Sequence, residues 1–454
     1  MALGQHVSGS HENLKRVLDK GLVVTTHYSG TGAAEMALAK IAPGRVKFHS
    51  ACDLDPICQA VLLNHPMECA AEHVSKDLCQ RPPPHMVDAL RAELQKHHAR
   101  LAARASTSSE IALEWVDAAM NILRSWTPRR EDGAFCVRHG QHCPAFPARG
   151  ASTPEPLHLE IDGINCQPWT TAGKKLGWLD SRSIPCLILV RTILCVEPDA
   201  ICLECTPKFD FATLKRLLHT YRGNYAITCP TDFGRPVARR RMYMWFDLLS
   251  SLDSVCAEVG TILDVSARSL LVGPEVFLTA SASDVRRCHY EMAQRASQKD
   301  IGLPKPVPRR LVGKQPPRML TPRSVLGAGD RTRYEGHRKK VELARGASTS
   351  AGCHMVDINR TPGWGGAPQC HHVPTILRSS KLMVFFQEEE QDRLLLPAEM
   401  PAMHGLHLPK CVMDRVPARG VRSLVGNSMH VAQVGCFVQY ALATRSYARG
   451  DETS

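Results

Sequence analysis

The sequence predicts an α/β protein with a Rossmann-like, mostly parallel sheet and a second, smaller, loop-rich domain. In the first half of the chain, short apolar or β-branched stretches alternate with amphipathic ones, as strands and helices do in a parallel sheet. A glycine turn separates the first strand from the first helix, as in nucleotide-binding units. From about residue 250 the alternation stops, and Pro, Gly and basic residues dominate 301–370.

The expected elements follow in order from the N-terminal side. Strands are expected at 22–28, 46–55, 199–205 and 240–249, and a strand followed by a loop at 157–168. Helices are expected at 29–41, 56–65, 185–196 and 211–221, and the segment 421–444 has helical spacing after a Gly-Asn-Ser turn. We expect 1–249 and 416–454 to form one domain, with 80–156 as a long insertion. Residues 250–415 would then form the second domain.

The bulk composition is that of a globular protein. The chain has 454 residues, of which 44% are hydrophobic and 22% charged, so it is long enough for two domains. No run reaches 18 uncharged apolar residues, and the first residues lack the layout of a secretory signal. The 18 cysteines are scattered, which indicates reduced thiols in the cytosol or nucleus. We therefore expect no membrane partner and no disulfide framework.

Positive charge is concentrated in one stretch. The net charge is +12, and residues 286–345 alone contain 16 Lys and Arg against 5 Asp and Glu. Such a stretch favours a polyanionic partner, because neutralised phosphates release counterions. A solvated basic loop without a partner is the alternative.

Two features near the N-terminus favour an adenosine cofactor. The turn 28–32 places Gly30 and Gly32 at a strand end, where the backbone can approach a ligand. About 20 residues later, Asp53 and Asp55 end the second strand, where a carboxylate can bind ribose hydroxyls. Alternatively the turn is only a tight connection, and either aspartate only caps the next helix.

Cys166 and Glu204 are the candidate reactive groups. Cys166 lies in a loop that follows a strand, where a cysteine among N–H donors can act as a nucleophile. Glu204 closes the next apolar strand at the same edge of the sheet, and such a carboxylate more often marks a site than a core position. A small buried cysteine and a hydrogen-bonded structural acid are the alternatives.

Arg239 and Arg241 have i, i+2 spacing at the entrance of a strand. Both side chains are therefore expected on one face, toward the same anion or base. Exposed arginines on an edge strand are the alternative.

The insertion contains one compact Cys/His group. Cys136, His139, His142 and Cys143 have spacings that could bind zinc. The group has no second pair nearby in the sequence, so we favour a surface loop without a metal ion.

Taken in order, these motifs resemble the DNA cytosine-5 methyltransferase family. The matching stretches are SGTG (29–32), CDLDP (52–56), KDL (76–78), NCQPWTTAGKKLGWLDSR (165–182), LEC (203–205), DFGRPVARRR (232–241), RLLLPAEMPAMHGLHLP (393–409) and GNS (426–428). They span 22–246 and 394–442 in the family's order, which is far more specific than any single motif.

The resemblance implies a class I methyltransferase sheet, with 250–415 as a target-recognition domain. It implies S-adenosylmethionine as cofactor and a flipped cytosine in double-stranded DNA as substrate. Cys166 would be the nucleophile, Glu204 would hydrogen-bond the base, and Arg239 and Arg241 would hold the base and a phosphate. The residues implied at the cofactor are Tyr28, Gly30, Thr31, Gly32, Asp53, Leu54, Asp77, Leu78, Asn427 and Ser428.

The sequence departs from the family pattern at four positions. Asn165 stands where the family has Pro, and Cys205 follows Glu204 where the family has Asn. Val237 replaces Gln, and Asp53 replaces Glu. The nucleophile, the acid and the paired arginines are retained, so we expect activity at a reduced rate.

Three alternatives remain at this point. A transfer-RNA cytosine-5 methyltransferase has the same architecture; we favour DNA because the basic second domain is long and no Cys-Phe-Thr element is seen. A catalytically silent nucleic-acid-binding homologue and a small-molecule methyltransferase follow. We expect a monomer in the nucleus, with the cytoplasm or an organelle as alternatives.

Overall fold

A computed structural model describes residues 12–103, 107–148, 156–170, 174–251, 259–270, 272–289, 326–346, 352–363, 372–388 and 391–445. The chain divides into two compact units. The first unit consists of Met1–Thr228, Arg240–Ala267 and Ser428–Ser454, and the second of Cys229–Arg239 and Arg268–Asn427. Residues 250–267 thus belong to the first unit and 416–427 to the second, whereas the expected boundaries were 249/250 and 415/416.

The first unit is built on a nine-stranded sheet with the order β5-β4-β3-β2-β1-β6-β7-β9-β8. The strands are β1 (Leu22–His27), β2 (Val46–Cys52), β3 (His73–Ser75), β4 (Gly133–Cys136), β5 (Gln141–Pro144), β6 (Leu157–Gly163), β7 (Ala200–Cys205), β8 (Tyr221–Thr228) and β9 (Arg241–Leu248). This sheet confirms the Rossmann-like α/β prediction.

The five central strands, in the sheet order β3-β2-β1-β6-β7, are parallel. β7 is buried along its whole length and β6 at all but its last residue, because helices cover both faces of a parallel sheet. The strand order reverses between β1 and β6. Ligands of open α/β sheets bind at such a reversal, beyond the carboxyl ends of the strands.

Antiparallel strands extend both ends of the parallel region. β9 pairs with β7 and with β8. The strand of this sheet that comes last in the sequence thus lies between two earlier strands. At the opposite end, β4 pairs with β3 and with β5. The strand expected at 240–249 is β9, whereas β8 was not anticipated.

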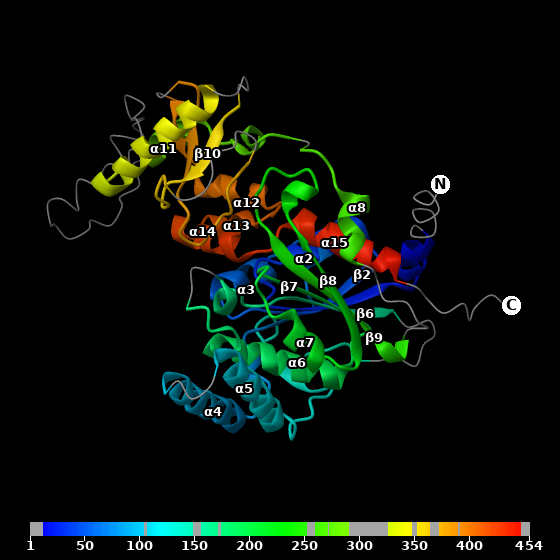
Figure 1. Cartoon of the computed structure of the whole chain (residues 1–454). Coiled ribbons are helices and arrows are strands. Elements are labelled where there is room, and N and C mark those ends of the chain that lie inside the picture. Colours follow the sequence, from blue (N-terminus) through cyan, green and yellow to red (C-terminus); the bar gives the residue numbers. More distant parts are fainter. Residues whose placement is uncertain are drawn as a thin grey trace. The chain divides into compact units, whose positions relative to one another are not determined.

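Helices pack on both faces of the sheet, with α4, α5, α6 and α7 on one side and α2, α8 and α15 on the other (Figure 1). The helices of the first unit include α2 (Ala33–Ile41), α3 (Pro56–Leu63), α4 (Pro84–Ala102), α5 (Ser108–Leu123), α6 (Ile184–Val196), α7 (Phe211–Leu217), α8 (Ile262–Ser266) and α15 (Val431–Thr444). α4 and α5 belong to the insertion and extend the main core through Trp115 and Leu90. Within the described ranges, no helix combines the length and apolarity needed to cross a membrane.

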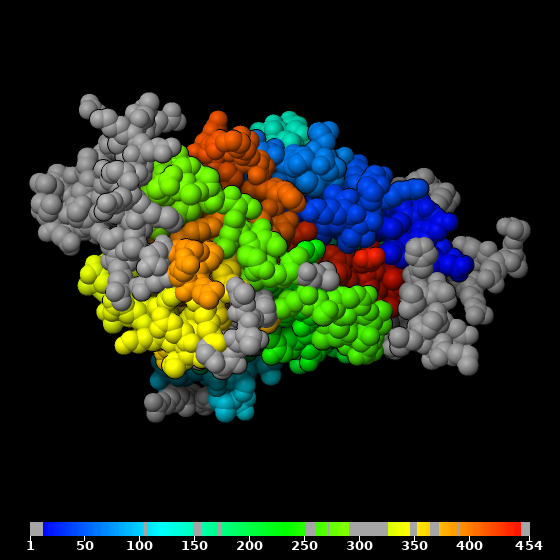
Figure 2. Space-filling model, turned by 90° about the horizontal axis from the view of Figure 1, so that it is seen from above, coloured from blue at the N-terminus to red at the C-terminus, as the bar shows by residue number. Residues whose placement is uncertain are grey.

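The C-terminal helix α15 completes the first unit. Gly435 allows a close approach, since a Cβ there would lie 3.4 Å from Ala37 and 3.3 Å from Ile41 on α2. The Phe437 ring packs against Tyr243 of β9 with 5.1 Å between ring centres. Figure 2 shows the red C-terminal segment between the blue N-terminal part and a green part of the chain, in agreement with the contacts of α15 with α2 and α8.

The second unit contains a three-stranded antiparallel sheet, β10-β11-β12. Its elements include β10 (His354–Asp357), β11 (Leu382–Phe385), β12 (Arg393–Leu394), α11 (Ala328–Gly346), α12 (Met400–Met403), α13 (Lys410–Met413) and α14 (Ala418–Asn427). α11 packs on this sheet through Tyr334, whose ring stacks on Phe385 at 5.5 Å.

Two arginines of the basic stretch make contacts inside the second unit. On α11, Arg338 pairs with buried Asp392 at 2.9 Å, and Arg345 donates to the carbonyls of Phe386 (2.5 Å) and Phe385 (3.0 Å). These two arginines stabilise the unit, so a polyanion would have to be bound by other basic residues. Residues 290–325 of the stretch lie outside the described residues.

Candidate active site

The turn after β1 has a left-handed backbone. The φ angles of Tyr28, Gly30 and Gly32 are 51°, 57° and 73°, which glycine adopts without strain. At Gly32 a Cβ would lie 2.0 Å from a ring carbon of His65, so no larger residue fits. The turn therefore leads tightly into α2 and presents its first N–H groups at the reversal point of the sheet.

Asp53, after β2, holds this turn in place. Its two carboxylate oxygens accept the N–H groups of Gly30 and Asp55, each at 2.8 Å, and burial raises its pKa. Asp55 caps α3 by accepting the N–H of Ile57 at 2.8 Å. Leu54 is 70% exposed, so an apolar side chain next to Asp53 is available to cover an aromatic ring.

Three of the predicted cofactor residues, Thr31, Leu78 and Ser428, have buried side chains. Thr31 is fully buried, and Leu78 is a member of the main hydrophobic core. Neither of these two side chains is therefore exposed to a ligand. Asp77 is half-buried and accepts the N–H of Cys79 at 2.9 Å, which caps the short 3-10 helix after β3.

The end of β6 joins the cysteine loop to the other two elements of the site. Gly163 lies opposite Glu204 in the β6–β7 register, and the N–H of Ile164 donates to the Glu204 carbonyl at 3.0 Å. A Cβ on Gly163 would lie 3.2 Å from the Tyr28 carbonyl, 3.0 Å from Met429 and 3.8 Å from the Glu204 carboxylate. The structure thus brings the glycine turn, the cysteine strand and the acid together at one edge of the sheet.

Cys166 is half-buried in the loop that follows. The side-chain oxygen of Asn165 accepts the N–H of Gln167 at 3.1 Å, and the Cys166 carbonyl accepts the N–H of Trp169 at 3.0 Å. Asn165 stands where the family that the sequence resembles has proline. Its side chain closes a local turn around the cysteine.

The segment 177–183 packs against the cysteine loop through Trp178 and Arg182. The rings of Trp169 and Trp178 meet edge to face with centres 5.4 Å apart. Arg182 hydrogen-bonds the Gln167 side chain and binds the Asp180 carboxylate with both arms of its fork, at 2.7 and 2.5 Å. Arg182 also interacts electrostatically with Cys166, and a cation near a thiol stabilises the thiolate.

Glu204 is buried and paired. It is 7% exposed, and one carboxylate oxygen lies 2.8 Å from Nε of Arg241. Its partner in the register is Tyr243, so Glu204 and Arg241 share the face of the sheet that carries α15. The next residue, Cys205, is buried and donates its thiol weakly to the Ile164 carbonyl at 3.8 Å. The pair is an acid with a fixed cation at the edge where Cys166 lies.

Arg239 does not share a strand with Arg241, contrary to expectation, because β9 begins at Arg241. Arg239 belongs to the second unit, where its guanidinium donates to the carbonyls of Ile376 (3.5 Å) and Gly426 (3.3 Å). Of the two arginines, only Arg241 therefore lies on the strand, and their i, i+2 spacing does not place them on one face.

The C-terminal motif is divided between the two units. Asn427, exposed, ends α14 in the second unit, and Ser428, buried, begins the last segment of the first. His430, two residues on, caps α15 by accepting the N–H of Gln433 at 3.4 Å. The segment from Ser428 thus anchors α15 beside the site.

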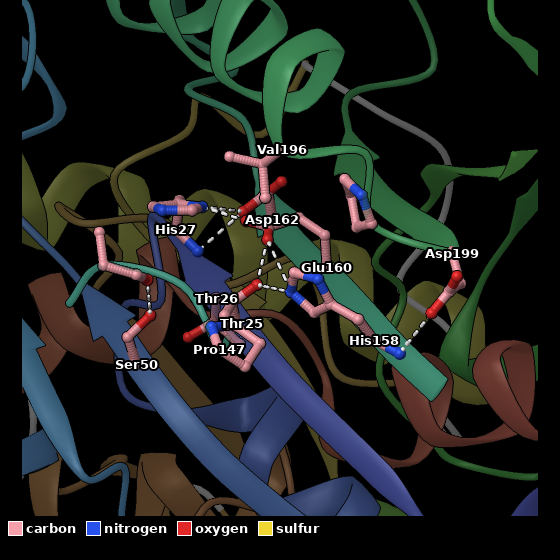
Figure 3. A network of polar contacts seen from close by, with 12 residues as sticks. Thr25, Thr26, His27, Ser50, Pro147, His158, Glu160, Asp162, Val196 and Asp199 are labelled. Carbon is pink, nitrogen blue, oxygen red and sulfur yellow. Dashed lines mark hydrogen bonds and ion pairs between the residues drawn. The ribbon is translucent and has the colours of Figure 1, made fainter. Parts of the chain in front are cut away.

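Beneath the site, β1 and β6 share a buried polar network that the sequence argument missed (Figure 3). The N–H of His27 donates to Asp162 at 2.7 Å, and its ring lies 3.0 Å from the same oxygen. The His27 ring also pairs with Glu160. The signal was present in the sequence, since His158, Glu160 and Asp162 occupy alternate positions of β6 and therefore share one face.

A chain of hydrogen bonds continues the network through Thr25. Arg130 donates to Nδ1 of His158 at 3.2 Å, which leaves Nε2 of that ring as the donor to Thr25, 3.0 Å away. The Thr25 hydroxyl then donates to Glu160. Glu160 thus receives the last hydrogen bond of this chain.

Burial controls protonation in this network. Burial raises the pKa of Asp162 to about 8, and the charge of Glu160 adds to the shift. For Glu160, burial alone would raise the pKa, but His27 outweighs burial and holds the pKa below its usual value. For His27, burial lowers the pKa, but the Glu160 charge outweighs it and the pKa is raised. The Glu160–His27 pair is therefore the charged centre of the network.

The metal candidates of the insertion are partly brought together. Cys136, His139 and Cys143 lie close to one another with His73, which the sequence argument had not included, and His142 is not a member of this group.

No family model matches the sequence, and no curated protein matches it. Among solved structures, the chain is similar to the Dnmt2 methyltransferase of S. pombe (TM-score 0.44, 15% identity), covering 93% of this chain and 98% of that one. It is similar at the same values to a putative DNA modification methyltransferase encoded within a prophage (E. coli). The methyltransferase EhMeth of Entamoeba histolytica gives a TM-score of 0.43 at 13% identity, with 93% and 98% covered.

Proposed function

We propose that this chain transfers a methyl group from S-adenosylmethionine to carbon 5 of cytosine in DNA through a covalent bond between Cys166 and carbon 6. The observation that carries the proposal is the meeting of three elements at the reversal point of the sheet. These are the glycine turn after β1, the Cys166 loop after β6 and Glu204 at the end of β7.

The residues around the turn fit the cofactor. Each oxygen of Asp53 accepts one N–H, and a carboxylate oxygen has a second lone pair that can accept a ribose hydroxyl. Exposed Leu54 can cover the adenine, and Asp77 can accept from its amino group. When bound, the cofactor supplies an electrophilic methyl group on a sulfonium.

The thiolate of Cys166 adds to C6 of a cytosine that has been flipped out of the duplex. A proton from solvent adds at N3, and the Glu204 carboxylate accepts hydrogen bonds from this N3–H and from the exocyclic amine. Electron density then rises at C5, which takes the methyl group. Loss of the C5 proton to a water molecule reforms the C5–C6 double bond and expels Cys166 as a thiolate, and N3 returns its proton to solvent.

Arg241 has a positioning role in this scheme. It holds one Glu204 oxygen and leaves the other on the side of Gly163, toward the glycine turn. The acid therefore points at the place where cofactor and base must meet. DNA is favoured as the polymer by the long basic region 286–345.

The test is a methyl-transfer assay with labelled S-adenosylmethionine on duplex DNA and on transfer RNA. Wild-type protein should produce 5-methylcytosine in DNA, and Cys166→Ser should lose at least about 10³-fold in rate while it still binds the cofactor. Cys195→Ser, a half-buried cysteine on α6, is the matched control and should keep full activity. Methylation of transfer RNA alone would reassign the substrate, and equal activity of Cys166→Ser would contradict the mechanism.

A further inference from the structure

The hairpin β4–β5 in the insertion carries a Cys/His cluster at one end of the main sheet. In its register Cys136 faces Gln141 and Cys143 faces Ala134. β4 also pairs with β3 through Ser75 and Cys136, so His73 of β3 approaches the hairpin. The four side chains come from two segments that are more than 60 residues apart in the sequence, and sheet pairing brings them together.

The cluster converges on one ring nitrogen. Nδ1 of His139 lies 3.3 Å from Nδ1 of His73, 3.5 Å from Sγ of Cys136 and 3.3 Å from Sγ of Cys143. All four potential ligand atoms lie within 4.8 Å of one another.

These separations are those of ligands around a tetrahedral zinc ion. Zinc bonds of about 2.0 Å to nitrogen and about 2.3 Å to sulfur place two nitrogens about 3.3 Å apart and a nitrogen and a sulfur about 3.6 Å apart. The distances from His139 agree with both values to within a few tenths of an ångström.

Hydrogen bonding alone does not explain the arrangement. A neutral imidazole nitrogen has either one proton or one lone pair, whereas Nδ1 of His139 has three polar atoms around it. Cys136 and Cys143 are not joined in a disulfide. Cys136 also accepts the N–H of Val74 at 3.3 Å, a contact that supports a thiolate ligand.

We infer that His73, Cys136, His139 and Cys143 bind a structural zinc ion, which goes beyond the proposed methyl transfer. Two thiolates and two imidazoles favour zinc over the hard cations magnesium and calcium. Binding would release the two thiol protons to solvent. Four protein ligands leave no open position for substrate, so the ion would be structural.

The site would fasten the insertion to the edge of the sheet next to the proposed cofactor pocket. β3 ends at Ser75, and Asp77 follows two residues later. Beside it, the ammonium of Lys76 lies 5.4 Å over the ring of Phe135 on β4. Metal binding would therefore fix the strand that positions Asp77.

The test begins with the metal content of the purified full-length chain, measured by mass spectrometry of the elements. We expect about one zinc per chain in the wild type, and a loss of at least about 80% of it in Cys143→Ser. His142→Ala is the matched control, because His142 is exposed on the same strand and its ring faces Phe135 at 6.1 Å between ring centres. It should keep the zinc.

Cobalt gives a second readout that needs no variant. Co²⁺ added to metal-stripped wild-type protein should produce the thiolate charge-transfer and d–d bands of a tetrahedral site, and Zn²⁺ should displace them. Wild-type protein that contains no zinc and gives no such bands would overturn the inference, as would zinc retained by a folded Cys143→Ser variant. Because metal content is measured without substrate, failure of the methyl-transfer proposal leaves this result unaffected.

Discussion

Two polar clusters lie on the same sheet and differ in how their charges are balanced. The interior cluster, His27 with Glu160 and Asp162, is fully buried between central strands. The hairpin cluster, His73 with Cys136, His139 and Cys143, lies at the end strands, and His139 is exposed. Both groups bring ligand atoms within 4.8 Å of one another.

The interior cluster carries its own counter-charges. Glu160 faces the His27 ring and receives the Thr25 hydroxyl, and Arg81 interacts electrostatically with both carboxylates. The hairpin cluster has two thiols and two imidazoles around one point. Charged side chains already neutralise the interior cluster, so it needs no metal ion. The two thiols of the hairpin cluster both lie against one nitrogen of His139 and have no such counter-charge among the described residues, so a metal ion is needed to balance them. The comparison therefore separates a buried ion-pair network from a metal site.

The largest effect is expected for Glu160→Gln. It removes the charge that compensates buried His27, and breaking one side of a buried pair costs about 3 kcal/mol. The Tm measured by calorimetry should fall by roughly 3–5 °C. Glu93→Gln, which breaks an exposed pair with Lys96, should shift Tm by under about 2 °C. Equal shifts in the two variants would show that the interior pair is not a structural centre.

Metal removal should act on the hairpin cluster alone. A strong chelator should lower the unfolding free energy of the wild type by about 3 kcal/mol, the value for an ion present at about 100 times its dissociation constant. Glu160→Gln should respond to the chelator as the wild type does, since distant sites contribute additively. Cys143→Ser should not respond. A chelator effect in Cys143→Ser equal to that in the wild type would place the ion elsewhere.

A smaller effect is expected from pH on the interior cluster. The pKa of Asp162 is raised from 3.8 to about 8, so the folded state keeps a proton that the unfolded chain releases. This stabilisation is complete below about pH 4 and is lost as pH rises to about 8. Asp162→Asn mimics the protonated form and removes this dependence. Between pH 5 and pH 6.5, the wild type should lose about 2 kcal/mol more stability than the variant. Parallel pH profiles of Tm would contradict the assignment.

Much of the site could be predicted because it depends on local order along the chain. An apolar strand followed by a loop places Cys166 at a sheet edge, and the strand that ends at Glu204 is next to it. The glycine turn and Asp53 were also found where strand ends predict them. Thr31 and Leu78 have buried side chains, which motif position alone does not reveal.

The features that were missed depend on pairing between distant segments. His73 reaches the cysteines only because β3 pairs with β4, and nothing in the sequence states that pairing. His142 and Cys143 are neighbours on β5, so their side chains point to opposite faces of the strand. His142 is therefore not a member of the cluster that contains Cys143. Arg239 was expected to share a face with Arg241, but β9 begins at Arg241, two residues after it.

The most direct test of the proposed chemistry is a covalent trap. Purified protein is incubated with S-adenosylmethionine and a duplex that contains 5-fluorocytosine, and the products are separated under denaturing conditions. Fluorine cannot leave C5 as a proton does, so an enzyme that forms the Cys166–C6 bond stays attached to the DNA. We predict a denaturation-resistant complex with the wild type and with Cys195→Ser, and none with Cys166→Ser. A complex that persists in Cys166→Ser, or no complex from folded wild-type protein that binds the cofactor, would contradict the account.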